Sequence, residues 1–328
     1  MESRRNSHYL LLAAVTLVSA ACSRNNAPPQ PTAVATTVES AMNKPSSKLN
    51  SGEPHITDST DGVHIEYRVR GTGTPLVVLV HGWSCDSNYW RAQLPALTPR
   101  YTVLTVDLAG HGASGRNRSD WSMQNFGADV AAAVRAYWSQ HVDAPRQVVL
   151  VGHSMGGPVV IEAARQLGAS VLGVIGVDTF KTFGLPPTDP KKIQGQMAAM
   201  NKDFIGYTRQ FVSTAFFTPS ANPAFVRQIA DDMSSAPPEV AIASVRGLNA
   251  WGAGAGSDLK DITVPIVAIV SDMSPLDDAR SRRVAPTLRS IVMAGHGHFL
   301  MMEDPAGFNP ILMHEIDALA GKSSAANR

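Results

Sequence analysis

The stretch from Val148 to Gly157 contains Ser154, the residue best suited to nucleophilic chemistry. An apolar run ends in Gly152-His153-Ser154-Met155-Gly156. This pattern is typical of a tight, strained turn from a buried strand into a helix. Glycine is needed on both sides because a Cβ would collide with neighbouring backbone, and the turn lifts the hydroxyl above the sheet edge. We therefore expect Ser154 to be a nucleophile, although such a serine can also sit in an ordinary loop.

A serine nucleophile needs a base to take its proton and N–H donors for the oxyanion that develops. His298 follows the last expected strand, where its imidazole can hang over the sheet edge towards Ser154. His296 competes with it, but Gly297 and Phe299 leave the loop at His298 free to turn and to anchor. We therefore predict His298 as the base.

The base in turn needs a carboxylate that orients it and stabilises its charged form. Asp272 is the first carboxylate after the expected strand 264–270, and we predict it as this acid. Asp178, which closes the strand after the nucleophile helix, is its rival. Asp277 and Asp278 lie farther along and are expected to be solvated.

The oxyanion donors are expected to be the backbone N–H groups of Met155 and Trp83. Met155 follows the nucleophile, and Trp83 lies in the loop after the expected strand 76–80, where its ring can also form a pocket wall. His81 and His153 are interpreted as local hydrogen-bonding residues. Asp107 and His111 are expected to shape a glycine-rich loop, and either could touch the site.

The elements around these residues alternate between strands and helices, which is typical of a mostly parallel sheet covered on both faces. Asp61-Gly62 predicts an edge hairpin between 56–57 and 63–69. Between about 180 and 257 the alternation stops and only helical spacing remains, which predicts a helical cap above the sheet that governs access to the site. Further strands are expected at 76–80, 101–106, 147–151, 171–177, 264–270 and 288–293, and helices at 89–97, 122–141, 156–167, 193–217, 223–233, 239–251, 279–284 and 304–319.

The first 22 residues have the charged, apolar and small-residue regions of an export signal. Ser19-Ala20-Ala21-Cys22 also resembles a bacterial lipobox, in which the cysteine is acylated, although Ser19 stands where an aliphatic residue is usual. Residues 23–54 read as a disordered linker, 55–321 as the folded domain and 322–328 as a tail. The protein is thus expected to be exported from a bacterium, either as an envelope lipoprotein tethered through Cys22 or in free form.

Composition narrows the function further. The formal net charge is +1, and charged residues make up 17% of the 328-residue chain, so nothing favours a nucleic-acid partner. No metal or cofactor is predicted, since the His and carboxylate residues lack ligand spacing and no phosphate-cradling loop follows a strand. A small, apolar substrate suits this surface better than a polyanion.

Four motifs in order resemble those of the α/β-hydrolase fold superfamily, in its capped serine esterase group. The resemblance covers roughly 63–319 and implies an eight-stranded sheet, a helical cap after the sixth strand and a Ser-Asp-His triad. The match is weakest at the acid, where the family loop usually has a glycine before the aspartate and this chain has Ser271. The motifs are His81-Gly82-Trp83, the loop 107–114, Gly152 to Gly157, and Gly297-His298-Phe299 with Glu303-Asp304-Pro305.

The function predicted from these residues is that of a serine hydrolase acting on carboxylic esters. Carbon–carbon bond hydrolases, lactonases and cofactor-free haloperoxidases or perhydrolases share the same triad and are the alternatives. A non-catalytic binding module on the same fold is a more remote one. Six cap aromatics could line an apolar acyl pocket, but such spacing more often forms the core of the cap itself: Phe204, Tyr207, Phe211, Phe216, Phe217 and Trp251.

Overall fold

The computed structural model describes residues 52–321, which belong to one compact unit. The predicted export signal, the lipobox at Cys22, nearly all of the linker and the tail lie outside the described residues. In the described part of the chain, no helix combines the length and apolar character that a membrane span requires.

An eight-stranded sheet forms the centre, with strand order β1-β2-β4-β3-β5-β6-β7-β8. The first two strands pair antiparallel at one edge, and β2 continues antiparallel onto β4. All other pairs are parallel. The predicted edge hairpin and mostly parallel sheet are both confirmed. The strands are β1 (Pro54–Asp58), β2 (His64–Arg70), β3 (Leu76–Val80), β4 (Thr102–Val106), β5 (Val148–His153), β6 (Val171–Val177), β7 (Ile266–Ser271) and β8 (Leu288–Met293).

The register of the central strands brings the chemically important loops to one edge. Every residue of β3, β4 and β5 is buried, as expected for continuous apolar runs covered on both faces. Val80 pairs with Val106 on one side and with Gly152 on the other. Val177 pairs with His153 and with Ile269. Because the parallel strands end together, the loops that follow β3, β4, β5, β6 and β7 meet at their carboxyl ends.

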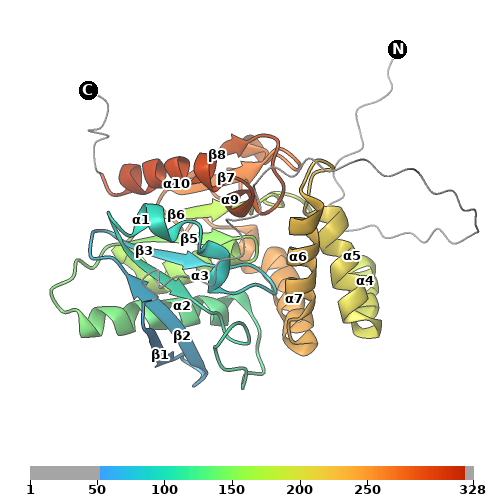
Figure 1. Ribbon diagram of the computed structural model, residues 1–328, viewed down its shortest axis with the longest axis horizontal. Coiled ribbons are helices and arrows are strands. Elements are labelled where there is room, and N and C mark those ends of the chain that lie inside the picture. The colour runs from blue at the N-terminus through green and yellow to red at the C-terminus, as the bar shows by residue number, and fades with distance from the viewer. Residues whose placement is uncertain (1–51, 322–328) are drawn as a thin grey trace, which may run out of the picture. The chain divides into compact units, whose positions relative to one another are not determined.

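Helices cover both faces of this sheet (Figure 1). The long helices α2 and α3 pack together, with Gly127 of α2 so close to Glu162 of α3 that a Cβ would lie 2.6 Å from the Glu162 Cβ. The α1 and α10 helices lie on the opposite face. Outside the cap, the helices are η1 (Ser87–Trp90), α1 (Leu94–Leu97), α2 (Met123–Gln140), α3 (Gly156–Leu167), η2 (Gly168–Ser170), α8 (Asp278–Ser281), α9 (Leu300–Glu303) and α10 (Pro305–Leu319).

The segment between β6 and β7 forms four helices beyond the carboxyl ends of the parallel strands, seen in yellow to orange in Figure 1. The expected single helix over 193–217 is two helices, because Asp203 leaves the helical conformation and its side chain accepts a hydrogen bond from the Gly206 N–H as an N-cap. The predicted helical insertion is therefore present, but with one more break than the spacing indicated. Its helices are α4 (Pro190–Lys202), α5 (Phe204–Ala215), α6 (Pro223–Ser234) and α7 (Pro238–Ala253), followed by η3 (Ala255–Ser257).

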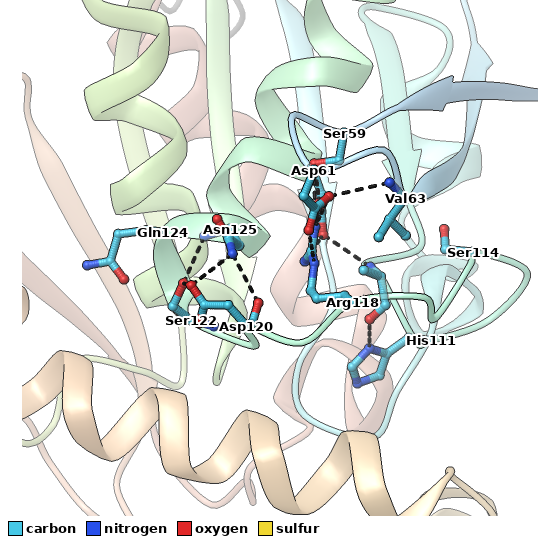
Figure 2. A network of polar contacts seen from close by, with 12 residues as sticks. Ser59, Asp61, Val63, His111, Ser114, Arg118, Asp120, Ser122, Gln124 and Asn125 are labelled. Atoms are coloured by element: carbon cyan, nitrogen blue, oxygen red, sulfur yellow. Dashed lines mark hydrogen bonds and ion pairs between the residues drawn. The ribbon is translucent and has the colours of Figure 1, made fainter.

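A buried ion network fixes the edge hairpin to α2 (Figure 2). The Arg118 side chain is 1% exposed and pairs with Asp61 at 2.7 Å and with Asp129 at 2.6 Å. Asp61 belongs to the predicted hairpin turn and Asp129 to α2, while the Ser59 hydroxyl donates a further bond to Asp129. Since breaking a buried pair leaves an uncompensated charge, this network constrains where the hairpin lies on the helix.

Candidate active site

Ser154 forms the turn between β5 and α3 in a left-handed conformation, with φ of 53°. Its N–H donates to the Val177 carbonyl at 3.0 Å. A Cβ on Gly152 would lie 2.2 Å from the Gly156 carbonyl oxygen, and one on Gly156 would lie 2.6 Å from the His81 carbonyl oxygen. The turn can therefore close only with glycine at both positions, and the predicted strained turn is confirmed.

His298 lies in the loop between β8 and α9, and its Nδ1 atom, backbone N–H and backbone carbonyl all form hydrogen bonds. The Nδ1 atom is 2.6 Å from an oxygen of Asp178. The His298 N–H donates to the Phe216 carbonyl at 2.7 Å, and its carbonyl accepts from His153 Nε2 at 2.9 Å. The Phe216 ring stacks on the imidazole with centroids 4.2 Å apart. These contacts fix the ring and make Nε2 the nitrogen that is left for chemistry.

The carboxylate bound to His298 belongs to Asp178, so the prediction that Asp272 orients the histidine is wrong. Asp178 follows β6, the neighbour of β5, and its φ of 47° turns the buried carboxylate towards His298. Asp272 follows β7, one strand farther from Ser154, and is exposed. Its Oδ1 accepts a hydrogen bond from the Gly295 N–H at 2.9 Å, which holds the loop that carries His298.

Asp178 is stabilised in its charged form. The Ser271 N–H donates to Oδ1 at 2.8 Å, and the Lys181 ammonium lies 2.7 Å from the same atom. Burial opposes ionisation of this carboxyl, but the hydrogen bond from His298 and the charge of Lys181 outweigh burial and hold the pKa of Asp178 well below its usual range. A neighbouring imidazolium would therefore face a permanently ionised partner.

The predicted oxyanion donors lie beside the nucleophile. Met155 follows Ser154 directly, and Trp83 lines the same cavity as Ser154. Within residues 52–321, neither backbone N–H is engaged by a hydrogen-bond acceptor. The Trp83 ring is buried, and its Nε1–H donates to the Ala241 carbonyl of α7 at 2.8 Å, so this residue also ties the cap to the sheet.

The other polar groups at this edge hold the loops, as predicted. His81 donates from Nδ1 to the Gly82 carbonyl and accepts from the Leu108 N–H at Nε2. Asp107 accepts two backbone N–H groups at 2.8 and 3.0 Å. His111 donates to a carbonyl two residues away, and burial lowers its pKa to about 3. These contacts hold the loops, and the buried His111 Nε2 has no hydrogen-bond partner among the described residues.

The space above the nucleophile is small. Its cavity volume is about 10 Å³, room for about one water molecule. The walls are mostly apolar, and the cap contributes Met233 of α6 and Phe216 just after α5. A larger substrate can therefore enter only if the Phe216 side chain or the whole cap moves. The cavity is lined by Gly82, Trp83, Cys85, His153, Ser154, Phe216, Met233, His298 and Phe299.

Of the six cap aromatics considered as pocket lining, only Phe216 borders this cavity. Tyr207 and Phe211 stack on each other, and Phe204 meets the edge of Trp83. Trp251 is buried and donates to Glu162 of α3. Phe217 stacks on Phe299, so most of these aromatics pack between the cap and the sheet domain and do not line the cavity.

A larger groove of about 540 Å³ lies between the start of α2 and α7. It is lined by residues such as Asp120, Trp121 and Arg246, and it contains neither Ser154 nor His298. The carboxylate of Asp120 is occupied by the N-terminal turn of α2. We place the chemistry in the small cavity because Ser154 and His298, which is paired with Asp178, both line it.

Two site residues were not found from the sequence. Lys181 contacts Asp178, and the Thr179 hydroxyl donates to the Ser154 carbonyl at 2.8 Å. The only signal was the local string Asp178-Thr179-Phe180-Lys181 at a strand end. Among the described residues, no group of three or more His, Cys, Asp or Glu side chains is arranged to hold a metal ion.

The family model described as the alpha/beta hydrolase family matches residues 77–311, which is most of the chain. This protein belongs to the alpha/beta hydrolase family. The match spans the strands that carry all of the site residues above, from Trp83 to His298. Membership of this family supports a hydrolase activity for the chain.

Curated relatives and solved structures agree with this membership. The chain is 27% identical over 260 residues to the pimeloyl-[acyl-carrier protein] methyl ester esterase of Yersinia enterocolitica, covering 75% of this chain and 95% of that protein. It is 23% identical to the 2-(acetamidomethylene)succinate hydrolase of Mesorhizobium japonicum, covering 78% and 92%. A thermophilic esterase from Thermogutta terrifontis superposes with a TM-score of 0.67 at 22% identity, covering 82% and 99%, which shows the shared α/β hydrolase fold.

Proposed function

We propose that this protein is a serine hydrolase that cleaves carboxylic esters through an acyl-enzyme. The observation that carries the proposal is the 2.6 Å bond between His298 Nδ1 and Asp178, with His298 and Ser154 lining the same cavity. The similarity of the chain to an esterase of the same family supports this assignment.

In this mechanism, the Ser154 hydroxyl attacks the ester carbonyl while His298 Nε2 takes its proton. Asp178 stabilises the resulting imidazolium through Nδ1, and the N–H groups of Met155 and Trp83 bind the oxyanion. His298 then returns the proton to the departing alkoxide. In the second half, a water molecule gives its proton to His298 and attacks the acyl carbonyl; His298 then returns the proton to the departing Ser154 oxygen, which releases the acid and restores the free enzyme.

The substrate proposed is a small-molecule ester with an uncharged acyl group. Around the nucleophile, Trp83, Phe216, Met233 and Phe299 offer apolar walls, and the closed cavity leaves little room for a branched acyl chain. A charged acyl group would lose its hydration there without gaining a partner.

We also propose that the enzyme is exported and works in the cell envelope or outside it. Support for this location comes from the charged, apolar and small-residue regions in residues 1–22. Mass spectrometry of the mature N-terminus tests it. Acylated Cys22 would establish a membrane tether, a free N-terminus near Cys22 would establish export alone, and an intact Met1 on protein recovered from the cytoplasm, with none in the envelope or medium, would contradict both.

The enzymatic proposal is tested with p-nitrophenyl acetate and a fluorophosphonate probe. Wild type should hydrolyse the ester and become labelled once, whereas Ser154→Ala should do neither. His298→Gln should remain folded and lose most of its turnover. Undiminished hydrolysis by Ser154→Ala would show that the nucleophile lies elsewhere.

A further inference from the structure

Lys181 is the one cation bonded directly to the carboxylate of the site in the part of the chain that the structure describes. Its Nζ lies 2.7 Å from Asp178 Oδ1 and 2.8 Å from Oδ2, with the Ser271 hydroxyl at 3.3 Å. Only 19% of the Lys181 side chain is exposed. The contact arises because Asp178 and Phe180 have φ values of 47° and 64°, which turn the chain back so that the lysine reaches the carboxylate three residues earlier.

This contact divides the negative charge of Asp178 between two partners. A histidine base becomes positively charged when it takes the proton of the nucleophile, and the orienting carboxylate normally stabilises that charge. A fixed ammonium on the same carboxylate offsets part of this stabilisation, since like charges disfavour each other at such range. Lys181 therefore opposes a second positive charge on His298 while it pins the carboxylate that His298 needs.

We propose that Lys181 is a positioning residue of the hydrolytic site: it holds Asp178 in the orientation that faces His298, and its ammonium offsets part of the negative charge that the carboxylate presents to the imidazole. This inference rests on the proposed hydrolase function.

The other charged or titratable groups around His298 do not reproduce this effect. His153 of β5 contacts the ring, but burial lowers the pKa of His153 to about 3, so it is uncharged under working conditions. Glu303 of α9 is engaged by the Gly297 N–H, and burial raises the pKa of Glu303. From the described part of the cap, the ring stacked on the imidazole is that of Phe216, which is uncharged.

The surroundings of Lys181 on the α8 side are also accounted for. Arg280 of α8 donates to the Lys181 carbonyl at 3.0 Å, and its guanidinium pairs with Asp277 at 3.9 Å. The carboxylate of Asp278 is occupied by Arg282 and by the Ser290 hydroxyl. Removing the Lys181 ammonium therefore removes the cation that touches Asp178 and leaves these pairs in place.

A purely structural role makes a different prediction. If Lys181 only neutralised a buried carboxylate for folding, its loss would lower stability or the active fraction at every pH. A role in setting the charge of His298 instead moves the acid limb of the pH profile of kcat/KM. The direction follows from the charge, because without the ammonium the imidazolium is less disfavoured and inactivation by protonation begins at a higher pH.

The experiment compares Lys181→Met and Lys181→Gln with wild type, using kcat/KM for p-nitrophenyl acetate between about pH 5 and 9. Both variants lose the charge, and the glutamine keeps an N–H donor for Asp178 if the methionine variant folds poorly. The acid limb should move up by about one pH unit in both. Lys181→Arg keeps the charge, and its limb should stay within about 0.3 units of wild type.

Lys260→Met is the matched control. Lys260 precedes β7 at the amino end of the strand, opposite the site, and pairs with the exposed Asp258. Lys260→Met removes one positive charge, as Lys181→Met does, and should leave the pH profile of kcat/KM unchanged. An acid limb at the wild-type position in both Lys181→Met and Lys181→Gln would overturn the inference while leaving the hydrolase intact. Full activity in Ser154→Ala would instead overturn the hydrolase proposal itself.

Discussion

Exchanging Asp178 for asparagine should abolish most of the turnover, whereas the same exchange at Asp272 should not. Asp178 is 3% exposed, and its carboxylate lies 2.6 Å from His298 Nδ1, so water has little access to stabilise the imidazolium in its place. An asparagine amide removes the charge that stabilises the imidazolium and can favour the wrong tautomer of the ring. In serine proteases the equivalent change lowers kcat by about 10⁴-fold, which corresponds to about 5.4 kcal/mol of transition-state stabilisation.

Asp272 offers the matched comparison on the neighbouring strand. Its side chain is exposed and accepts one backbone N–H bond, from Gly295 at 2.9 Å, which an asparagine oxygen can also accept. We therefore expect Asp272→Asn to keep kcat within about 3-fold of wild type, since exposed substitutions usually cost less than about 0.5 kcal/mol.

The assay is kcat for a short p-nitrophenyl ester, with thermal unfolding of each variant as the control for folding. Asp178→Asn leaves the Lys181 ammonium without its carboxylate partner, so the double variant Asp178→Asn with Lys181→Met provides a neutral background. Both should be folded and nearly inactive. A large loss in Asp272→Asn with less than about a tenfold loss in Asp178→Asn would refute the assignment of the acid.

Three further outcomes follow from the contacts of the described residues. Burial lowers the pKa of His111 to about 3, so between about pH 6.5 and 3 the unfolded chain binds a proton that the folded chain does not. The free energy of unfolding therefore falls on acidification. In chemical denaturation, His111→Gln should reduce the pH slope of this free energy by about 1.4 kcal/mol per pH unit. Trp251→Phe deletes the 2.6 Å bond to the buried Glu162, and calorimetry should show a loss of about 1 to 3 kcal/mol with kcat unchanged, whereas equal stability would mean that the bond contributes nothing. Phe216→Ala removes the ring stacked on His298, so kcat/KM for bulky acyl esters should rise relative to that for acetate, and an unchanged ratio would show that Phe216 does not limit the cavity.

The fold could be predicted from the sequence because its signals are local. The buried run of β5 and the glycines around Ser154 specify the turn through steric exclusion alone, and Asp61-Gly62 specifies the edge hairpin. His298 could be predicted for a similar reason, since Gly297 and Phe299 on either side of it distinguish it from His296 in the same loop. In the cap, the extra break at Asp203 depends on a side-chain cap, which periodicity does not reveal.

The acid could not be predicted because its position is decided by backbone conformation. Asp178 and Asp272 both follow parallel strands, and spacing does not distinguish them. The deciding features are the left-handed φ of Asp178, directly after the strand next to β5, and the Ser271 N–H, which donates a hydrogen bond to the Asp178 Oδ1. A non-glycine residue with positive φ is uncommon, and the residue type alone does not reveal that Asp178 adopts one. Lys181 was missed for the same reason, because its contact depends on that turn.

The central claim is that Ser154 carries the acyl group, and trapping that intermediate tests it most directly. Wild-type enzyme is mixed with a short p-nitrophenyl ester, quenched in acid within the first turnovers, digested and analysed by mass spectrometry. The account predicts an acyl mass increment on the peptide that contains Ser154 and no increment in Ser154→Ala. An increment on a different residue, or ester hydrolysis that continues in Ser154→Ala, would contradict it.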